Sequence, residues 1–314
     1  MSPTSLVSIH ILNYNGGEDI LQCLASLRQL AYSSFRIVVI DNASTDGSLA
    51  RIQRQFPEVS IIRNTANLGF GAGHMVGIRE ALNRHIPYIW LLNQDTTVAN
   101  DSLQYLIDTM EGDPTIGSIS PLILNPDDTV WFTNGRIDWW RMRAVHAKSS
   151  FNAPEYLSGC ALFIRSEVFA KAIAFDERYF LYYEDTDLSI QLKQFGFKLS
   201  VEPKARVWHT ETSARQPLIK TLWLVWSGLL FFSKNTPWWW RPWVLLYFFL
   251  RVSYNKLLCF FRPTPFRHAL RELYRFFLHT YGYRPFLIHS RQLSQCAPHP
   301  PMDQLIARSS RRSR

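Results

Sequence analysis

The sequence predicts an α/β fold in which a mainly parallel sheet is flanked by helices. The chain has 314 residues, of which 47% are hydrophobic, so it is long enough for one large domain or for one domain with an appendage. Short apolar runs alternate with helical stretches, which is the pattern of βαβ units. Several of the apolar runs stop at polar residues and turn signals, as strands do where they enter loops.

The elements follow one another clearly along the first 124 residues. LVSIHIL is rich in β-branched residues and stops at NYNGG, and FRIVVI stops at DNASTDGS, where Ser44, Thr45 and Asp46 are suitable N-caps for the next helix. The glycines of NLGFGAG give a flexible backbone ahead of a further helix. YIWLL has lost strict alternation, as a fully buried strand does. The predicted strands cover 6–12, 35–40, 59–64, 88–92 and 117–124, and the predicted helices cover 18–30, 48–55, a stretch ending near Arg84, and 102–110.

Beyond Pro126 the pattern becomes irregular and aromatic. SGCALFIRSEVFAKA then predicts a strand followed by a helix, LSIQLKQFG predicts another helix, and a strand-like run precedes VWHTE. Composition changes after Glu211. The sequence therefore predicts three parts, namely an α/β domain over 1–211, an aromatic and basic helical region over 212–291, and a disordered Pro/Ser/Arg-rich tail over 292–314.

The basic character of the chain belongs to its last third. Positions 212–314 hold 16 Lys and Arg against 2 Asp and Glu, whereas positions 1–211 hold 18 against 23. The basic residues are interleaved with large apolar ones, as in WWWRPWVLLYFFLR. This mixture favours an anionic membrane surface over nucleic acid, with an ordinary solvated basic face as the plainer alternative.

Two apolar runs of this region, 222–232 and 243–250, are shorter than the roughly 20 residues that a simple spanning helix needs. We expect amphipathic helices in the membrane plane, with a single span over 238–261 as the less favoured reading. The N-terminus shows no charged stretch ahead of an apolar one, and the four cysteines have no metal-site or disulfide spacing. These features predict a cytoplasmic protein, peripheral on the inner face of the cell membrane.

Polar residues follow three predicted strands, namely Asn13-Tyr14-Asn15, Asp41-Asn42-Ala43-Ser44 and Asn93-Gln94-Asp95. In an open parallel sheet, ligands bind beyond the carboxyl ends of the strands, so these groups are expected at one edge. Each alone is explained equally well by a helix cap or a turn. GFGAG lacks a Walker lysine and is a weak signal by itself.

Two further segments contain candidate metal-binding or catalytic residues. Asp95 follows a buried strand, and hard oxygen ligands of this kind hold a metal that a nucleotide diphosphate also binds. Three carboxylates in EDTD repel one another, which raises a pKa towards the range of a general base. The plainer readings are a turn residue for Asp95 and helix-capping roles for the acidic cluster. A lone histidine such as His209 is usually structural.

Taken in order, HILNYNG, VVIDNASTDGS, NLGFGAGHMVGI, WLLNQDTTV, SGCALFIR, FLYYEDTDLS and VWHTE resemble the inverting family-2 glycosyltransferases of the Rossmann-like GT-A fold. Among these, the bacterial rhamnosyltransferase-like members are most similar. The segments run in family order from about residue 6 to residue 211, two thirds of the chain. Several are loose individually, but the ordered series is specific.

The resemblance implies a nucleotide-sugar donor at the sheet edge. Asn13 and Tyr14 would lie on the donor side, with Tyr14 at the nucleobase, and Asp41 would accept a hydrogen bond from a pyrimidine N–H. Asn67 and the glycines from Gly69 onward would line the nucleotide.

The resemblance also implies a metal and a base. Asp95 matches the last position of the D-x-D motif that binds Mg²⁺ or Mn²⁺, and His209 matches a position that completes the metal shell. Asn93 replaces the first Asp and is a poorer cation ligand. Glu184 and Asp185 match the catalytic pair, with Asp185 as the base that takes the proton of the acceptor hydroxyl. One carboxylate and no covalent intermediate mean inversion.

The leading hypothesis is therefore a transferase that moves L-rhamnose from a dTDP donor to a lipid-linked cell-surface polysaccharide. His74 and Met75 stand where related enzymes more often carry Asn, which leaves a UDP-hexose or UDP-N-acetylhexosamine donor as an alternative. A nucleotidyltransferase would need an N-terminal basic Gly-rich loop that NYNGGED does not offer. The non-enzyme alternative is a catalytically degenerate membrane-associated scaffold, in which Asn93 marks the loss of the first Asp of the metal-binding motif.

Overall fold

The computed structural model describes residues 5–148, 153–210 and 217–260. The chain divides into two compact units, Met1–Arg215 and Gln216–Arg314, which are described separately below. The predicted tail over 292–314 lies outside the described residues.

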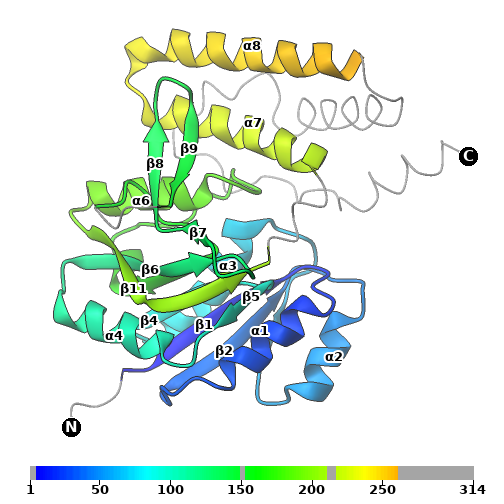
Figure 1. The fold of residues 1–314 in the computed structure, drawn as a ribbon, viewed down its shortest axis with the longest axis vertical. Helices are drawn as coiled ribbons and strands as arrows, with labels where there is room; N and C mark the ends of the chain where they lie inside the picture. Colours follow the sequence, from blue (N-terminus) through cyan, green and yellow to red (C-terminus); the bar gives the residue numbers. More distant parts are fainter. Residues whose placement is uncertain (1–4, 149–152, 211–216, 261–314) are drawn as a thin grey trace, which may run out of the picture. The chain divides into compact units, whose positions relative to one another are not determined.

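The first unit contains a nine-stranded sheet and a separate two-stranded hairpin (Figure 1). The strands are β1 (Val7–Asn13), β2 (Phe35–Asp41), β3 (Ser60–Arg63), β4 (Tyr88–Asn93), β5 (Thr96–Val98), β6 (Ile116–Leu124), β7 (Val130–Phe132), β8 (Asn134–Asp138), β9 (Arg143–Ala147), β10 (Ala161–Arg165) and β11 (Lys198–His209). The order across the large sheet is β3-β2-β1-β4-β10-β6-β11-β5, with β7 paired to β6, and β8 pairs with β9.

The sheet is mixed, and the expectation of a mainly parallel sheet is wrong. Pairs β1–β2, β1–β4, β2–β3 and β6–β11 are parallel, whereas pairs β4–β10, β6–β10, β5–β11 and β6–β7 are antiparallel. The first strands are joined by helical crossovers, as parallel pairing requires. The later strands follow turns and irregular segments, which allow antiparallel pairing.

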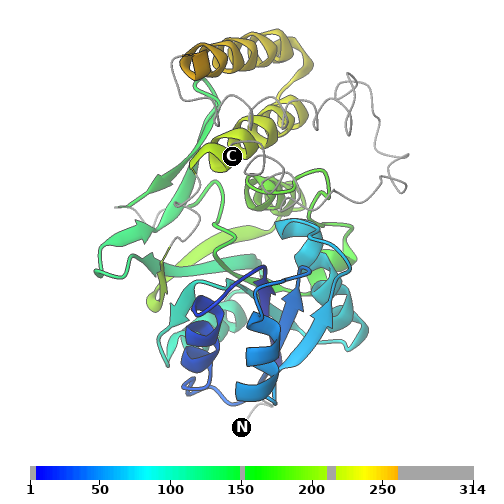
Figure 2. The same cartoon turned by 90° about the vertical axis from the view of Figure 1, so that its right-hand side faces the viewer.

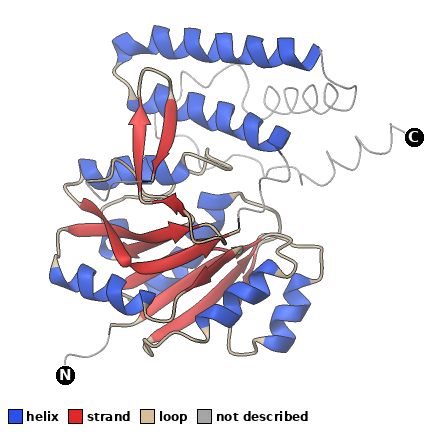
Figure 3. Cartoon of the chain, in the orientation of Figure 1, coloured by secondary structure: helices blue, strands red, loops and turns tan. Residues whose placement is uncertain are grey.

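Six helices belong to the first unit, within its described residues. They are α1 (Asp19–Leu27), α2 (Ser48–Gln55), α3 (Phe70–Asn83), α4 (Ser102–Gly112), α5 (Glu167–Ala170) and α6 (Glu184–Gln194). Figures 2 and 3 show helices on both sides of the sheet. The predicted strands and helices of the first 124 residues are confirmed to within a few residues, and α2 has the predicted bounds.

The connections create a reversal in the strand order between β1 and β4. Helices α1 and α2 carry the chain outward from β1 to β3, and α3 carries it back past β1 to β4. Right-handed crossovers therefore place α1 and α2 on one face and α3 on the other. Such a reversal leaves a crevice at the carboxyl ends of the two strands, where ligands bind in α/β sheets.

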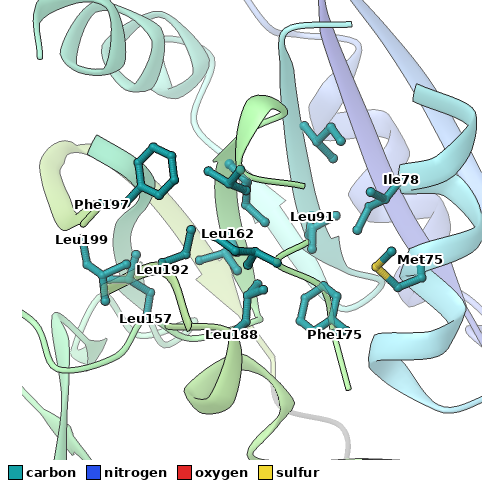
Figure 4. Close-up of a cluster of buried hydrophobic side chains, with 14 of the residues drawn as sticks. Met75, Ile78, Leu91, Leu157, Leu162, Phe175, Leu188, Leu192, Phe197 and Leu199 are labelled. Atoms are coloured by element: carbon teal, nitrogen blue, oxygen red, sulfur yellow. The ribbon is translucent and has the colours of Figure 1, made fainter. Parts of the chain in front are cut away.

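A hydrophobic cluster joins α3 and α6 to the sheet face between them (Figure 4). Met75 and Ile78 of α3 meet Leu91 of β4, and Leu188 of α6 meets Leu162 of β10. Each such buried side chain contributes about 1.5–3 kcal/mol to the stability of the fold. Because α6 begins at the predicted acidic cluster, this packing fixes the position of that cluster relative to β4.

The second unit, within its described residues, consists of α7 (Pro217–Asn235), the short 3-10 helix η2 (Trp238–Trp240) and α8 (Arg241–Phe260). The rings of Phe232 and Phe248 lie 6.3 Å apart and join α7 to α8. Both predicted apolar runs are helical, and both helices are longer than those runs. Across the described ranges, no helix combines the length and the apolar character needed to cross a membrane.

His10 and His74 are fully buried in the first unit. Ser8 Oγ lies 2.9 Å from His10 Nε2, whereas His10 Nδ1 and both ring nitrogens of His74 have no hydrogen-bond partner among the described residues. Burial, with the charge of Arg36 as a second cause, lowers the pKa of His10 from 6.5 to about 3. Burial, followed by the proximity of His10, lowers the pKa of His74 to the same value. Both rings are therefore neutral in the folded protein above about pH 3.

We predict that the fold loses stability as the pH falls below 6.5. The unfolded chain then takes up protons that the folded chain excludes, so the free energy of unfolding falls by roughly 1.4 kcal/mol per pH unit for each histidine until the folded-state pKa is reached. Urea denaturation at pH 7.5 and pH 5 measures this slope. His10→Gln and His74→Gln should each reduce it, and the exposed His85→Asn should not. An unchanged slope in both variants would assign the acid sensitivity to other groups.

Candidate active site

The ends of β1 and β2 form one polar cluster at the sheet edge. Asn13 and Asp41 are register partners in the parallel ladder, so their side chains leave the sheet together. Asn13 Nδ2 donates to Asp41 Oδ1 at 2.8 Å and also approaches the hydroxyls of Ser44 (3.0 Å) and Ser48 (3.1 Å). Asp41 is buried, and its Oδ2 accepts from the Ser44 backbone N–H at 3.3 Å. The structure thus joins two of the predicted donor-side residues.

The loop before α3 lies against the same cluster. Asn67 Oδ1 accepts from the backbone N–H of Gly69 at 2.9 Å and from Asn42 Nδ2 at 3.2 Å. Gly69 has φ +82°, and a Cβ there would lie 2.3 Å from the carbonyl oxygen of Phe180. Only glycine fits such a position. The next residue, Phe70, donates its backbone N–H to that carbonyl at 2.8 Å, so the loop is tied to the segment ahead of α6.

The turn after β4 reaches back to β1. Gln94 Oε1 accepts from the Tyr14 backbone N–H at 2.8 Å, and Gln94 Nε2 donates to the Tyr14 carbonyl at 3.3 Å. Gly16 lies so close to this pair that a Cβ would be 2.9 Å from Gln94 Oε1. These contacts join the turn after β4 to the turn after β1 at the carboxyl ends of the two strands.

Asp95 and His209 face each other across the end of the sheet. His209 pairs with Thr96 in the β5–β11 ladder, and Thr210 donates its backbone N–H to the Asp95 carbonyl at 3.0 Å. As a result His209 Nε2 lies 3.3 Å from Asp95 Oδ1 and 3.5 Å from Asn93 Nδ2. Both side chains of the Asp95–His209 pair are more than 90% buried.

The surroundings of His209 stabilise its charged form. Burial lowers the pKa of His209, but Cys160 and Asp95 outweigh burial and raise it to about 11. Trp131 packs edge-to-face on the imidazole with 4.7 Å between ring centroids. The imidazole is therefore held in place by an ion pair and by an aromatic ring.

The geometry fits a divalent cation held by few protein groups. Metal–ligand distances of about 2.0–2.2 Å bring two ligand atoms on one ion to within about 3 Å of each other, close to the separation of Asp95 Oδ1 and His209 Nε2. Carboxylate oxygen and the nitrogen of a neutral imidazole are both suitable ligands, and a bound cation would take the place of the proton on His209 Nε2. Within the described residues, no group of three or more His, Cys, Asp or Glu side chains is arranged to hold a metal ion. A cation here would need further ligands from a bound diphosphate.

Glu184 and Asp185 begin α6 and differ in their surroundings. Asp185 Oδ2 accepts from the Gly159 backbone N–H at 2.8 Å, and Asp185 Oδ1 accepts from the Thr186 backbone N–H at 2.6 Å. Burial raises the pKa of Asp185, and these hydrogen bonds oppose the rise. Burial, and then the charge of Asp185, raise the pKa of Glu184 well above its usual range. Asp185, whose charge these hydrogen bonds stabilise, is therefore the carboxyl of the pair that ionises more readily.

Consecutive residues connect this acidic pair to the metal-binding candidates. Gly159 binds Asp185, and the next residue, Cys160, accepts a backbone hydrogen bond from Asn93 at 2.9 Å. Direct contacts between the predicted site residues occur within three groups, namely Asn13 with Asp41, Asn67 with Gly69, and Asn93 and Asp95 with His209. Their catalytic and binding roles stay predictions.

Sequence reasoning missed several residues that shape the site. Gln94 lies in the polar turn after β4 and had no predicted role, although its side-chain amide pairs with the backbone of Tyr14. Cys160 and Trp131 flank His209, and Tyr156 is buried near Asp185. Nothing in the irregular aromatic stretch singles out Trp131 or Tyr156, because their positions depend on the β6–β7 pairing and on α6.

Comparison with known proteins agrees with this arrangement. Residues 8–171, half of the chain, match the family model described as glycosyl transferase family 2. The N-acetylglucosaminyl-diphospho-decaprenol L-rhamnosyltransferase of Mycobacterium tuberculosis is 26% identical over 276 residues, which cover 76% of this chain and 87% of the relative.

Solved structures share the fold at low sequence identity. The mannosyltransferase PcManGT from Pyrobaculum calidifontis, solved with GDP-Man and Mn²⁺, superposes with a TM-score of 0.57 at 15% identity, over 90% of this chain and 85% of that one. GalNAc-T7, solved with UDP, GalNAc and Mn²⁺, superposes with a TM-score of 0.56 at 19% identity. The match covers 74% of this chain and about half, 51%, of the GalNAc-T7 chain.

The GT-A fold, the polar groups at the β1–β4 reversal and the family match over residues 8–171 lead to one conclusion. This chain belongs to glycosyl transferase family 2.

Proposed function

We propose that the chain is an inverting, metal-dependent glycosyltransferase that moves L-rhamnose from dTDP-L-rhamnose to a hydroxyl of a lipid-linked cell-surface polysaccharide. The observation that carries this proposal is the placement of the Asp95–His209 pair and the hydrogen-bonded Asp185 at one sheet edge, joined through Gly159 and Cys160. The name of the M. tuberculosis relative supports a lipid-diphosphate acceptor and a rhamnosyl donor. A UDP-linked donor is the alternative for the same site.

The donor binds along the β1–β4 reversal in this proposal. Asn13 and Asp41 meet the nucleobase side together with Tyr14, and Asn67 and Gly69 line the nucleotide. Glycine at position 69 leaves room for the Phe180 carbonyl, so the nucleotide loop packs directly against the segment ahead of α6. These groups lie in the proposed catalytic domain, 1–211.

Asp95 and His209 would hold Mg²⁺ or Mn²⁺ at the diphosphate, with Asn93 beside them. When bound, the cation supplies neutralisation of the charge that develops on the leaving nucleoside diphosphate. Asp185 accepts the proton of the attacking hydroxyl at its carboxylate, while the N–H groups of Gly159 and Thr186 hold that carboxylate in place. A single base, with no carboxylate assigned as a nucleophile, gives inversion at the anomeric carbon.

The second unit brings the enzyme to its lipid-linked acceptor in this proposal. Exposed apolar residues recur along α8 at spacings of three and four, which places them on one side of the helix. They are Leu246, Phe249, Leu250, Tyr254 and Leu257. Two exposed tryptophans of η2, Trp238 and Trp239, precede them, and the region is strongly basic. Apolar side chains beside basic ones fit an anionic bilayer surface, on the cytoplasmic side.

Asp185→Asn should reduce turnover by at least about 100-fold, because the amide cannot take the hydroxyl proton. Donor binding should persist, since Asp185 does not line the proposed nucleotide side. The measurements are release of nucleoside diphosphate from a donor panel with Mg²⁺, and donor affinity by calorimetry. Asp108→Asn, an exposed carboxylate on α4, is the matched control. Full activity in Asp185→Asn would show that the base assignment is wrong.

Metal binding should depend on the Asp95–His209 pair and should improve when a carboxylate is restored beside it. Titration of Mn²⁺ into the protein with bound dTDP should show weaker binding for Asp95→Asn and His209→Ala. Asn93→Asp should bind Mn²⁺ roughly tenfold more tightly, because an anionic ligand replaces a neutral amide 3.5 Å from His209 Nε2. Nucleotide binding that is indifferent to EDTA, together with no turnover, would favour the degenerate scaffold.

The intact protein should float with vesicles that contain phosphatidylglycerol. Replacing Phe249 and Leu250 by Glu should release it, because the apolar contact is lost and negative charge is added. Phe195→Glu, a comparably exposed phenylalanine of the first unit, is the control and should leave flotation unchanged. Equal flotation of all three proteins would exclude this face of α8 as the membrane contact.

A further inference from the structure

Near Asp185, two buried polar groups make no hydrogen bond to any described residue. Tyr156 is 2% exposed, and its hydroxyl makes no hydrogen bond within the described part of the chain. Glu184 is 5% exposed, and its Oε2 also has no hydrogen-bond partner among the described residues. A buried polar atom without a partner costs about 1–3 kcal/mol, so such groups call for an explanation in terms of a ligand or function.

The backbone fixes Tyr156 beside the first turns of α6. Leu157 donates its N–H to Ser189 Oγ at 3.1 Å, and Gly159 donates to Asp185 Oδ2 at 2.8 Å. Ser189 Oγ in turn donates to the Asp185 carbonyl at 2.8 Å. The segment that starts at Tyr156 therefore runs along the helix end that carries the proposed base.

The ring of Tyr156 is clamped from the other side. Gly135 of β8 donates its N–H to the Tyr156 carbonyl at 3.0 Å, and a Cβ on Gly135 would lie 2.2 Å from the ring. Phe132 packs against the ring with 6.0 Å between centroids. Burial raises the pKa of Tyr156, and the negative charge of Asp185 raises it further, so the hydroxyl keeps its proton and remains a donor. A side chain held this firmly cannot easily turn to find another partner.

We propose that two groups beside Asp185, the Tyr156 hydroxyl and the Glu184 carboxyl, form a subsite that binds non-reacting hydroxyls of the acceptor sugar. This inference rests on the proposed function. We assign the acceptor, and not the donor, to this subsite because the proposed base Asp185 contacts the attacking sugar. The residues proposed to line the donor are Asn13, Asp41 and Asn67. A polar subsite of this kind discriminates strongly against sugars that lack the hydroxyl, because its buried groups are then left unpaired.

Tyr156→Phe tests the proposal by removing only the hydroxyl. With dTDP-L-rhamnose and N-acetylglucosaminyl diphosphate on a short prenyl chain, we expect kcat/KM for the acceptor to fall about tenfold while the donor KM is unchanged. The variant should be at least as stable as the wild type by thermal unfolding, since the lost group has no partner. Tyr32→Phe, which removes a hydroxyl bonded to the Ser5 carbonyl, is the control and should lower stability without altering the acceptor KM.

Acceptor analogues that each lack one non-reacting hydroxyl complete the test. With the wild type, one analogue should be about tenfold poorer than the complete acceptor. Tyr156→Phe should use that analogue and the complete acceptor almost equally well, as a double-mutant cycle requires for a direct contact. Glu184→Gln, which keeps a donor, should retain more acceptor efficiency than Glu184→Leu.

The outcomes separate the two proposals. Suppose that the wild type transfers the sugar. If Tyr156→Phe then has an unchanged acceptor KM, or if its kcat/KM falls by the same factor for every analogue, the subsite is excluded and the proposed function stands. Lower stability of Tyr156→Phe with unchanged kinetics would point to an ordered water on the hydroxyl and would also exclude the subsite. No transfer by the wild type to any lipid-diphosphate sugar would refute the proposed function itself.

Discussion

The pairing of β5 with the end of β11 is the constraint on which the site depends. Only Gln94 and Asp95 separate β4 from β5, yet these strands lie at different places in the sheet, with β10, β6 and β11 between them. The sheet has to curl so that its last strands return to the end of β4. This curl places His209 beside Asp95, although 113 residues separate them in the chain.

One face of β4 contributes both to the hydrophobic core and to the candidate active site. Ile89 and Leu91 lie in the cluster that anchors α3 and α6, and Asn93 continues the same alternation into the site. The core that stabilises the fold therefore also positions α6 and its carboxyls. His10 and His74, both buried and neutral, leave three ring nitrogens without a hydrogen-bond partner among the described residues, and keeping the two rings neutral costs more stability as the pH falls.

The sequence was sufficient for the local elements and for the fold family. Alternating apolar runs located β1 to β4 and their helices, because hydrophobic periodicity is a local property. The mixed character of the sheet was not predicted, because pairing direction in the later strands depends on contacts between distant residues. Asp95, His209 and Asp185 were predicted as site residues from ordered motifs, and the structure brings Asp95 and His209 together. Tyr156, Cys160 and Trp131 were not, since each owes its place to a neighbour far away in the sequence.

The contact between Gly69 and Phe180 joins two parts of the site that the sequence separates by more than a hundred residues. The loop proposed to line the nucleotide and the segment that leads into the catalytic helix share a backbone hydrogen bond and leave no room for a side chain between them. The conformation of the nucleotide loop is therefore coupled to that of the segment ahead of α6. A side chain at position 69 would push both backbones apart and so disturb the two proposed halves of the site together.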